Sequence, residues 1–88
     1  MFLINFFLNN MKLVLIYTTP TCVYCVAAKE FFKKNNIVYT EYNVLTDMAR
    51  REEMIENSEQ MGVPVIMVDD EIIVGFDKPK IVQLLGIK

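Results

Sequence analysis

The two cysteines of the chain, Cys22 and Cys25, lie three positions apart in the stretch YTTPTCVYC. Such a pair can be a redox-active dithiol, half of a metal site, or a structural disulfide. A thiol in the first turn of a helix meets unsatisfied backbone N–H groups and the positive end of the helix dipole, and both favour the nucleophilic thiolate. The pattern therefore predicts that Cys22 is the accessible attacking thiol. Cys25, one turn later and pointing inward, is predicted to resolve the mixed disulfide that Cys22 forms.

The two other uses of the pair receive less support from the composition. Zinc prefers four ligands, whereas this chain has two cysteines and no histidine. A metal or an iron–sulfur cluster would therefore have to be shared with a second chain or an outside thiol. A structural disulfide across so short a loop would remove little chain entropy. The lack of histidine also excludes Ser/His and Cys/His catalysis, and we expect no bound metal or other cofactor.

The composition indicates one small globular domain. Apolar residues make up 53% of the 88 residues, with only three Gly and three Pro. The net charge of −2, with nine basic residues interleaved among eleven acidic ones, predicts no binding to nucleic acid or to an acidic membrane. Two cysteines are too few for the disulfide framework of a secreted domain, so we expect a cytoplasmic location. We also expect the protein to be a monomer.

Residues 1–10, MFLINFFLNN, are interpreted as an apolar extension of a domain that spans residues 11–88. The stretch is far shorter than the roughly 20 apolar residues that cross a bilayer, and it lacks the features of a signal peptide. Two interpretations stay open. The stretch is either an extension upstream of the natural start of the domain, or an apolar flap or edge strand that packs on the domain or on a partner.

The elements that hold the cysteine pair are predicted by local patterns. A nearly continuous β-forming run before the pair is typical of a central strand that is buried on both faces. Thr21 is expected to cap the helix that follows. Periodicity places Cys25, Lys29 and Phe32 on one face of this helix, and two asparagines, residues 35–36, end it.

The whole chain alternates strands and helices before it ends in a hairpin and a last helix. The expected elements are strand 12–17, helix 22–34, strand 37–44, helix 48–59, strand 63–68, strand 72–74 and helix 78–85. A helix joins the first two strands, which should therefore be parallel with a right-handed crossover. A tight polar turn predicts an antiparallel hairpin for the last two. The order β-α-β-α-β-β-α predicts an α/β fold: one four-stranded mixed sheet flanked by three helices on both faces.

Three landmarks of the chain resemble those of the glutaredoxins, which have the thioredoxin fold. Tyr-Thr-x-x-x-Cys-x-x-Cys opens the first helix, Gly-Val-Pro precedes a strand, and Gly-Phe-Asp follows the hairpin. The resemblance runs from about Met11 to Leu85. It implies a dithiol–disulfide oxidoreductase that takes glutathione as co-substrate and reduces disulfide-containing proteins or mixed disulfides of glutathione.

The resemblance also implies roles for residues outside the pair. Pro64 falls on the proline that the family holds in cis opposite the cysteines, and Val63 would offer its main-chain N–H and C=O to the substrate. Tyr24 would stack beside the substrate thiol. Three consecutive residues fall on the segment that grips the γ-glutamyl end of glutathione: Gly75, Phe76 and Asp77. An alternative for Phe76 is simple packing under the last helix.

The departures from the family pattern concern the reductant. Many glutaredoxins have a proline at the position of Val23 and a lysine that attracts glutathione at the position of Thr19, which makes Thr19 a candidate substrate contact. Many also have a second acidic residue after Asp77, where this chain has Lys78. A valine at the position of Val23 also resembles the motif of the glutaredoxin-like redoxins, which are reduced by thioredoxin reductase. Glutathione and a thioredoxin-reductase-like flavoprotein therefore both stay open as the reductant.

Overall fold

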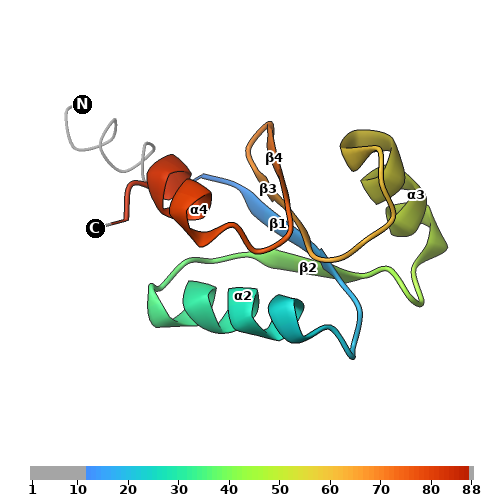
Figure 1. Ribbon diagram of the computed structural model, residues 1–88, viewed down its shortest axis with the longest axis horizontal. Helices are drawn as coiled ribbons and strands as arrows, with labels where there is room; N and C mark the ends of the chain where they lie inside the picture. The colour runs from blue at the N-terminus through green and yellow to red at the C-terminus, as the bar shows by residue number, and fades with distance from the viewer. Residues whose placement is uncertain (1–11, 88) are drawn as a thin grey trace.

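The computed structural model of the protein describes residues 12–87, so the predicted extension, residues 1–10, lies outside the described residues. The elements are β1 (Val14–Thr18), α2 (Val23–Lys34), β2 (Thr40–Asn43), α3 (Met48–Ser58), β3 (Val65–Val68), β4 (Glu71–Val74) and α4 (Lys78–Leu85) (Figure 1). Their order confirms the prediction, and each element overlaps the range expected for it. Within residues 12–87, no helix has the length and the run of apolar residues needed to cross a membrane.

The strands form one mixed sheet in the order β2-β1-β3-β4. β1 is parallel to β2, with Leu15 opposite Thr40, and antiparallel to β3, with Tyr17 opposite Val65. β3 and β4 form the predicted antiparallel hairpin. β1 thus has a strand on each side, and most of its side chains are buried. It is the central strand that its sequence predicts.

Helices cover both faces of this sheet. Phe32 of α2 and Ile81 of α4 pack with Ile16 in one buried cluster, whereas Met54 of α3 packs with Tyr17 in another. Ile16 and Tyr17 are neighbours in β1, and successive side chains of a strand point to opposite faces. α2 and α4 therefore lie on one face and α3 on the other, as a thioredoxin-like fold requires.

α2 ends at the predicted pair of asparagines. Asn36 adopts a left-handed conformation, with φ 57°, and the Ile37 N–H then donates to the Phe32 C=O at 2.8 Å. This bond satisfies one of the last carbonyls of the helix. Because Ile37 is tied to the end of α2, the pairing of β2 with β1 begins at Thr40, later than the sequence predicts.

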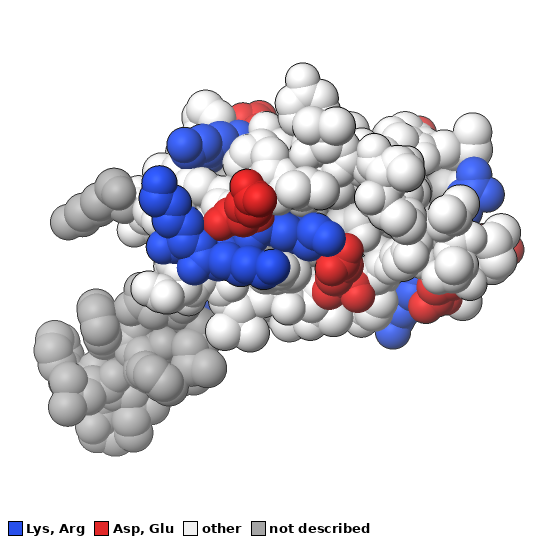
Figure 2. Space-filling view, turned by 90° about the horizontal axis from the view of Figure 1, so that it is seen from below, with Lys and Arg blue, Asp and Glu red and all other residues white. Residues whose placement is uncertain are grey.

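Charges of both signs mix on the face that α2 presents to solvent. α2 carries Lys29, Lys33 and Lys34, and Lys29 Nζ forms an ion pair with Glu41 Oε2 of β2 at 2.8 Å. Seen from below, Lys and Arg side chains gather on this face with Asp and Glu side chains between them (Figure 2). The mixture agrees with the interleaved charges of the sequence.

A polar contact also joins α3 to the sheet. The hydroxyl of the buried Tyr17 donates a hydrogen bond to Glu53 Oε2, and Arg50 Nη1 donates to Glu53 Oε1 at 2.8 Å. The Arg50 guanidinium lies 4.1 Å from the centre of the Tyr42 ring. Burial of the hydroxyl and the Glu53 carboxylate raise the pKa of Tyr17 to about 12.

We expect the free energy of unfolding to decrease as the pH rises from about 10 to about 12. The pKa of Tyr17 is 10.0 without its folded surroundings and about 12 in the fold. The stability that comes from the protonated hydroxyl is therefore complete below the lower value, and it is lost as the pH rises through the higher one. Urea denaturation across this range measures the slope. Tyr17→Phe should make the slope shallower, and a variant with the wild-type slope would contradict the assignment.

Candidate functional site

The cysteine pair lies where β1 leads into α2. The Cys22 N–H donates to the Thr19 C=O at 3.3 Å, which closes a turn with Pro20 in its second position. Cys22 itself is the N-cap of α2, with extended dihedrals (φ −88°, ψ 111°), and its Sγ accepts the Cys25 N–H at 3.1 Å. The prediction that Thr21 caps the helix is wrong, because Thr21 is a central residue of the turn and the cap falls one residue later.

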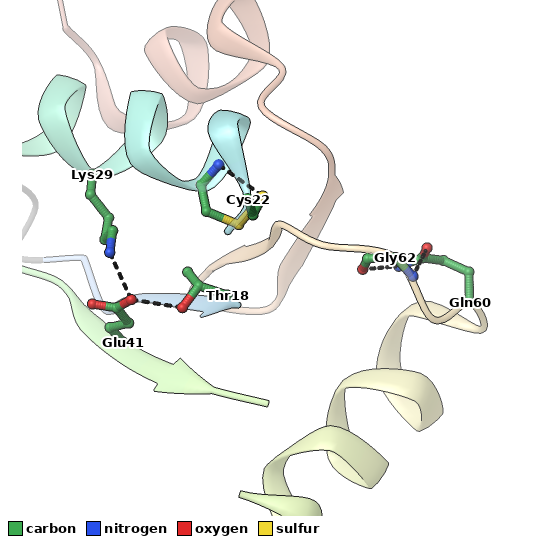
Figure 3. The surroundings of a disulfide bond; sticks show 7 residues. Thr18, Cys22, Lys29, Glu41, Gln60 and Gly62 are labelled. Atoms are coloured by element: carbon green, nitrogen blue, oxygen red, sulfur yellow. Dashed lines mark hydrogen bonds and ion pairs between the residues drawn. A yellow bond between two sulfur atoms is a disulfide. The ribbon is translucent and has the colours of Figure 1, made fainter. Parts of the chain in front are cut away.

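Cys22 and Cys25 form a disulfide, with their Cα atoms 5.1 Å apart. Figure 3 shows this bond at the start of α2, close to Thr18 at the end of β1. Cys25 is fully buried, whereas Cys22 is half-buried. Once the disulfide is reduced, the Cys25 N–H and the positive end of α2 both stabilise negative charge on the Cys22 sulfur. The greater exposure of Cys22 and the stabilisation of its thiolate favour the predicted roles, in which Cys22 attacks and Cys25 resolves.

Pro64 lies beside the end of β1 that leads to the pair. Because Tyr17 pairs with Val65, Pro64 is level with Thr18 one residue before β3 begins. The Val63–Pro64 bond is cis, Pro64 is buried and Val63 is half-buried. Within residues 12–87, neither the N–H nor the C=O of Val63 has a hydrogen-bond partner. Both groups are therefore unpaired within the part of the chain that the structure describes.

The segment after β4 reaches the same end of the sheet. The Gly75 N–H donates to the Pro64 C=O at 2.8 Å, and Gly75 adopts φ 84°, a conformation that glycine tolerates. Phe76 instead packs against the α2–α4 cluster, where its ring centre lies 5.9 Å from that of Phe31. Its contacts are therefore those of the packing alternative. Asp77 is exposed and caps α4.

The two remaining predicted residues differ in their surroundings. Thr19 is half-buried in the turn that presents Cys22, whereas Tyr24 is 68% exposed on the first turn of α2. The structure thus brings most of the predicted residues to one end of the sheet: Thr19, Cys22, Cys25, Val63, Pro64 and Gly75.

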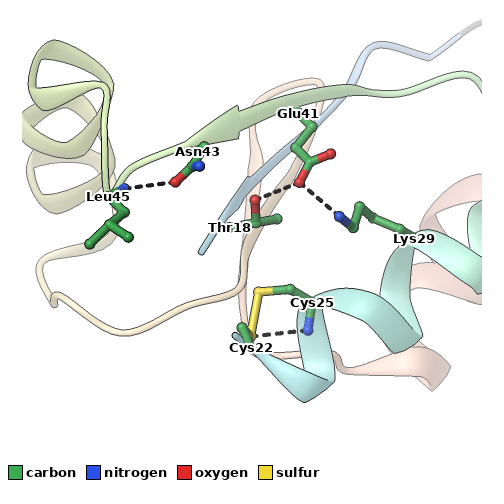
Figure 4. A network of polar contacts seen from close by, with 7 residues as sticks. All are labelled: Thr18, Cys22, Cys25, Lys29, Glu41, Asn43 and Leu45. Carbon is green, nitrogen blue, oxygen red and sulfur yellow. Dashed lines mark hydrogen bonds and ion pairs between the residues drawn. A yellow bond between two sulfur atoms is a disulfide. The ribbon is translucent and has the colours of Figure 1, made fainter. Parts of the chain in front are cut away.

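A polar network next to the pair was not predicted. The hydroxyl of the buried Thr18 donates to Glu41 Oε2 at 2.7 Å, and Lys29 Nζ donates to the same oxygen at 2.8 Å. Figure 4 shows these three side chains facing one another beside the disulfide. Partial burial raises the pKa of Glu41, but the hydrogen bonds from Lys29 and Thr18 outweigh it and lower the pKa. The only signal in the sequence was the place of Lys29 on the face of the helix that carries Cys25.

A cavity of about 610 Å³ lies away from this site, at the other end of β1. It is lined by residues 12–14, 35–40 and 85–87. None of the predicted site residues borders it, so the cysteine pair belongs to an open surface and not to this cavity. Within residues 12–87, no three His, Cys, Asp or Glu side chains are grouped so that they could hold a metal ion.

Known proteins share both the sequence pattern and this architecture. The sequence model of the family Glutaredoxin matches residues 14–73. A glutaredoxin-like 8.6 kDa protein of the rubredoxin operon of Clostridium pasteurianum is 49% identical over 73 residues, which are 83% of this chain and 97% of that protein. Glutaredoxin 3 of Escherichia coli K12 is 39% identical over 62 residues, which are 70% of this chain and 75% of that protein. The crystal structure of the thioredoxin-like protein BC3987 has a TM-score of 0.78 at 38% identity, and the match covers 82% of this chain and 99% of that one.

Proposed function

Because the chain belongs to the glutaredoxin family, we propose that it is a dithiol–disulfide oxidoreductase that reduces protein disulfides or mixed disulfides of glutathione. The observation that carries the proposal is the placement of the pair. Cys22 is half-buried at the start of α2 and its Sγ accepts the Cys25 N–H at 3.1 Å, whereas Cys25 is fully buried. This arrangement favours one reactive thiolate with a second thiol in reach.

The reaction proceeds by two exchanges of sulfur partners. The Cys22 thiolate attacks one sulfur of the substrate disulfide, which forms a mixed disulfide and releases the other half as a thiolate. Cys25 then passes its proton to the departing group and attacks the Cys22 sulfur. The second half leaves as a thiol and the Cys22–Cys25 disulfide forms, so that the substrate gains the two electrons that the pair loses. Val63 pairs its free N–H and C=O with the substrate backbone during the attack.

We propose glutathione as the co-substrate that reduces the pair again. Its support is the placement of Gly75, whose N–H is hydrogen-bonded to the Pro64 C=O, two residues before the exposed Asp77 that caps α4. The alternative reductant is a thioredoxin-reductase-like flavoprotein. The alternative is favoured by Thr19, which is uncharged and half-buried where a lysine would attract a carboxylate of glutathione.

Turnover of a disulfide with each reductant tests the proposal. We expect the protein to reduce hydroxyethyl disulfide with NADPH, glutathione and glutathione reductase at least about tenfold faster than with NADPH and thioredoxin reductase, a difference of about 1.4 kcal/mol in barrier. The opposite ratio would select the flavoprotein. Reactions without the protein are the control for direct reduction by glutathione. No turnover with either system, for a protein that dithiothreitol reduces, would contradict the proposed function.

A further inference from the structure

We infer that Gln60 is a positioning residue that aims the Val63 N–H at the substrate, an inference that rests on the proposed function. Gln60 follows α3 in the short connection to β3, and the sequence pattern of the family did not single it out. Its carboxamide takes part in three hydrogen bonds, and two of them are to Gly62, the residue before Val63.

The Gln60 carboxamide holds Gly62 from both sides. Oε1 accepts the Gly62 N–H at 2.7 Å, and Nε2 donates to the Gly62 C=O at 3.1 Å. Nε2 also donates to Ser58 Oγ at 3.2 Å, and the Ser58 hydroxyl donates to the Met54 C=O at 2.6 Å. Figure 3 shows the contacts between Gln60 and Gly62 where the chain leaves α3 for β3. The end of α3 therefore fixes the carboxamide, and the carboxamide fixes Gly62.

Holding the Gly62 C=O sets the direction of the next N–H. The peptide group between Gly62 and Val63 is planar, and in a trans peptide the C=O and the N–H point in opposite directions. Because the C=O is turned toward Gln60, the Val63 N–H points away from Gln60. On the other side, the Gly75 N–H holds the Pro64 C=O at 2.8 Å. Val63 thus lies between two fixed carbonyls, and its own free groups keep one orientation.

The hydrogen-bond pattern determines which replacements test this role. The Gly62 N–H is a donor, so the atom that faces it must be the carboxamide oxygen. Gln60→Glu keeps the size and that acceptor, but it turns a carboxylate oxygen toward the Gly62 C=O, where two acceptors repel. Gln60→Ala removes both contacts. Gln83, exposed on α4, offers a matched control for the loss of a carboxamide.

Two chromogenic disulfides separate docking from thiol reactivity. Dithiobis(nitrobenzoate) has no peptide backbone that could pair with Val63. The second probe is a short extended peptide whose cysteine is joined by a disulfide to the same thionitrobenzoate group, and its backbone can pair with Val63. With either probe, the Cys22 thiolate attacks the disulfide, forms a mixed disulfide and releases thionitrobenzoate, whose absorbance gives the second-order rate constant.

We expect the rate constant on the peptide disulfide to fall about fivefold to tenfold in Gln60→Ala and Gln60→Glu, as for the loss of about one substrate hydrogen bond. The rate constant on dithiobis(nitrobenzoate) should stay within about twofold of wild type, because neither change touches the sulfur. Gln83→Ala should match wild type on both probes. If Gln60→Ala does not fold, the comparison of Gln60→Glu with wild type is sufficient to test the role of Gln60.

Two results would overturn the docking role of Gln60 alone: equal losses on both probes in Gln60→Glu, or wild-type rates on the peptide disulfide in both variants. A wild-type protein that reacts with dithiobis(nitrobenzoate) no faster than free cysteine would overturn the proposed function, and the docking role with it.

Discussion

Cys22→Ser should lower disulfide turnover by at least about a thousandfold, because in the proposed mechanism it removes the attacking thiolate. A serine hydroxyl at the same N-cap can still accept the Cys25 N–H, so the fold should remain while the chemistry is lost. The remaining thiol, Cys25, is fully buried and cannot take over the attack. The coupled assay with NADPH measures the loss, with the double variant Cys22→Ser/Cys25→Ser as its zero point.

Cys25→Ser should behave differently, because it removes only the second exchange. Cys22 still attacks, and the mixed disulfide then accumulates, which mass spectrometry detects as a covalent adduct on Cys22. Reduction of small glutathione disulfides should persist where a second glutathione replaces the resolving thiol. Alkylation of the reduced wild-type protein at mildly acidic pH supplies an independent check. Faster labelling of Cys25 than of Cys22 would reverse the two roles.

The sequence predicts the parts of this site that depend on local patterns. The β-forming run before Cys22 gives β1, and the spacing of the pair gives its place at the start of α2. The Val63–Pro64 dipeptide is indicated by the resemblance to a known family, and its cis bond is confirmed. Helix ends and turns follow from residue types within a few positions, so their errors are small, as the shift of the N-cap from Thr21 to Cys22 illustrates.

The parts that were missed depend on contacts between distant segments. Glu41 approaches Thr18 and Lys29 only because β2 pairs with β1 in one particular register. The sequence predicts that the strands are parallel, but no local pattern specifies that register. Gln60 is a different case, since it contacts Gly62 only two residues away. Its role depends on Val63 being a docking residue, which local periodicity does not reveal.

Phe32 packs the helix that carries the cysteine pair against the sheet. Phe32→Ala should lower the free energy of unfolding by about 3–5 kcal/mol. Phe32 lies on the face of α2 that carries Cys25, and both side chains are fully buried. The Phe32 ring centre lies 5.3 Å from that of Tyr39 and 6.2 Å from that of Phe31. Phe32 also packs with Ile16 of β1, so removing the ring leaves a cavity between α2 and the sheet.

A loss of this size is serious for a small domain, whose total stability is commonly about 5–15 kcal/mol. Phe31→Ala is the matched control, because Phe31 is the neighbouring phenylalanine of α2 but is only half-buried. We expect it to cost about 1–2 kcal/mol, which is less than the loss at Phe32. Urea denaturation of both reduced variants measures the two losses. Equal losses would contradict the claim that α2 is held to the sheet through Phe32. If the claim holds, Phe32 contributes to packing and takes no part in the chemistry of the pair. The rate constant of Phe32→Ala on dithiobis(nitrobenzoate) should then fall only in proportion to the folded fraction.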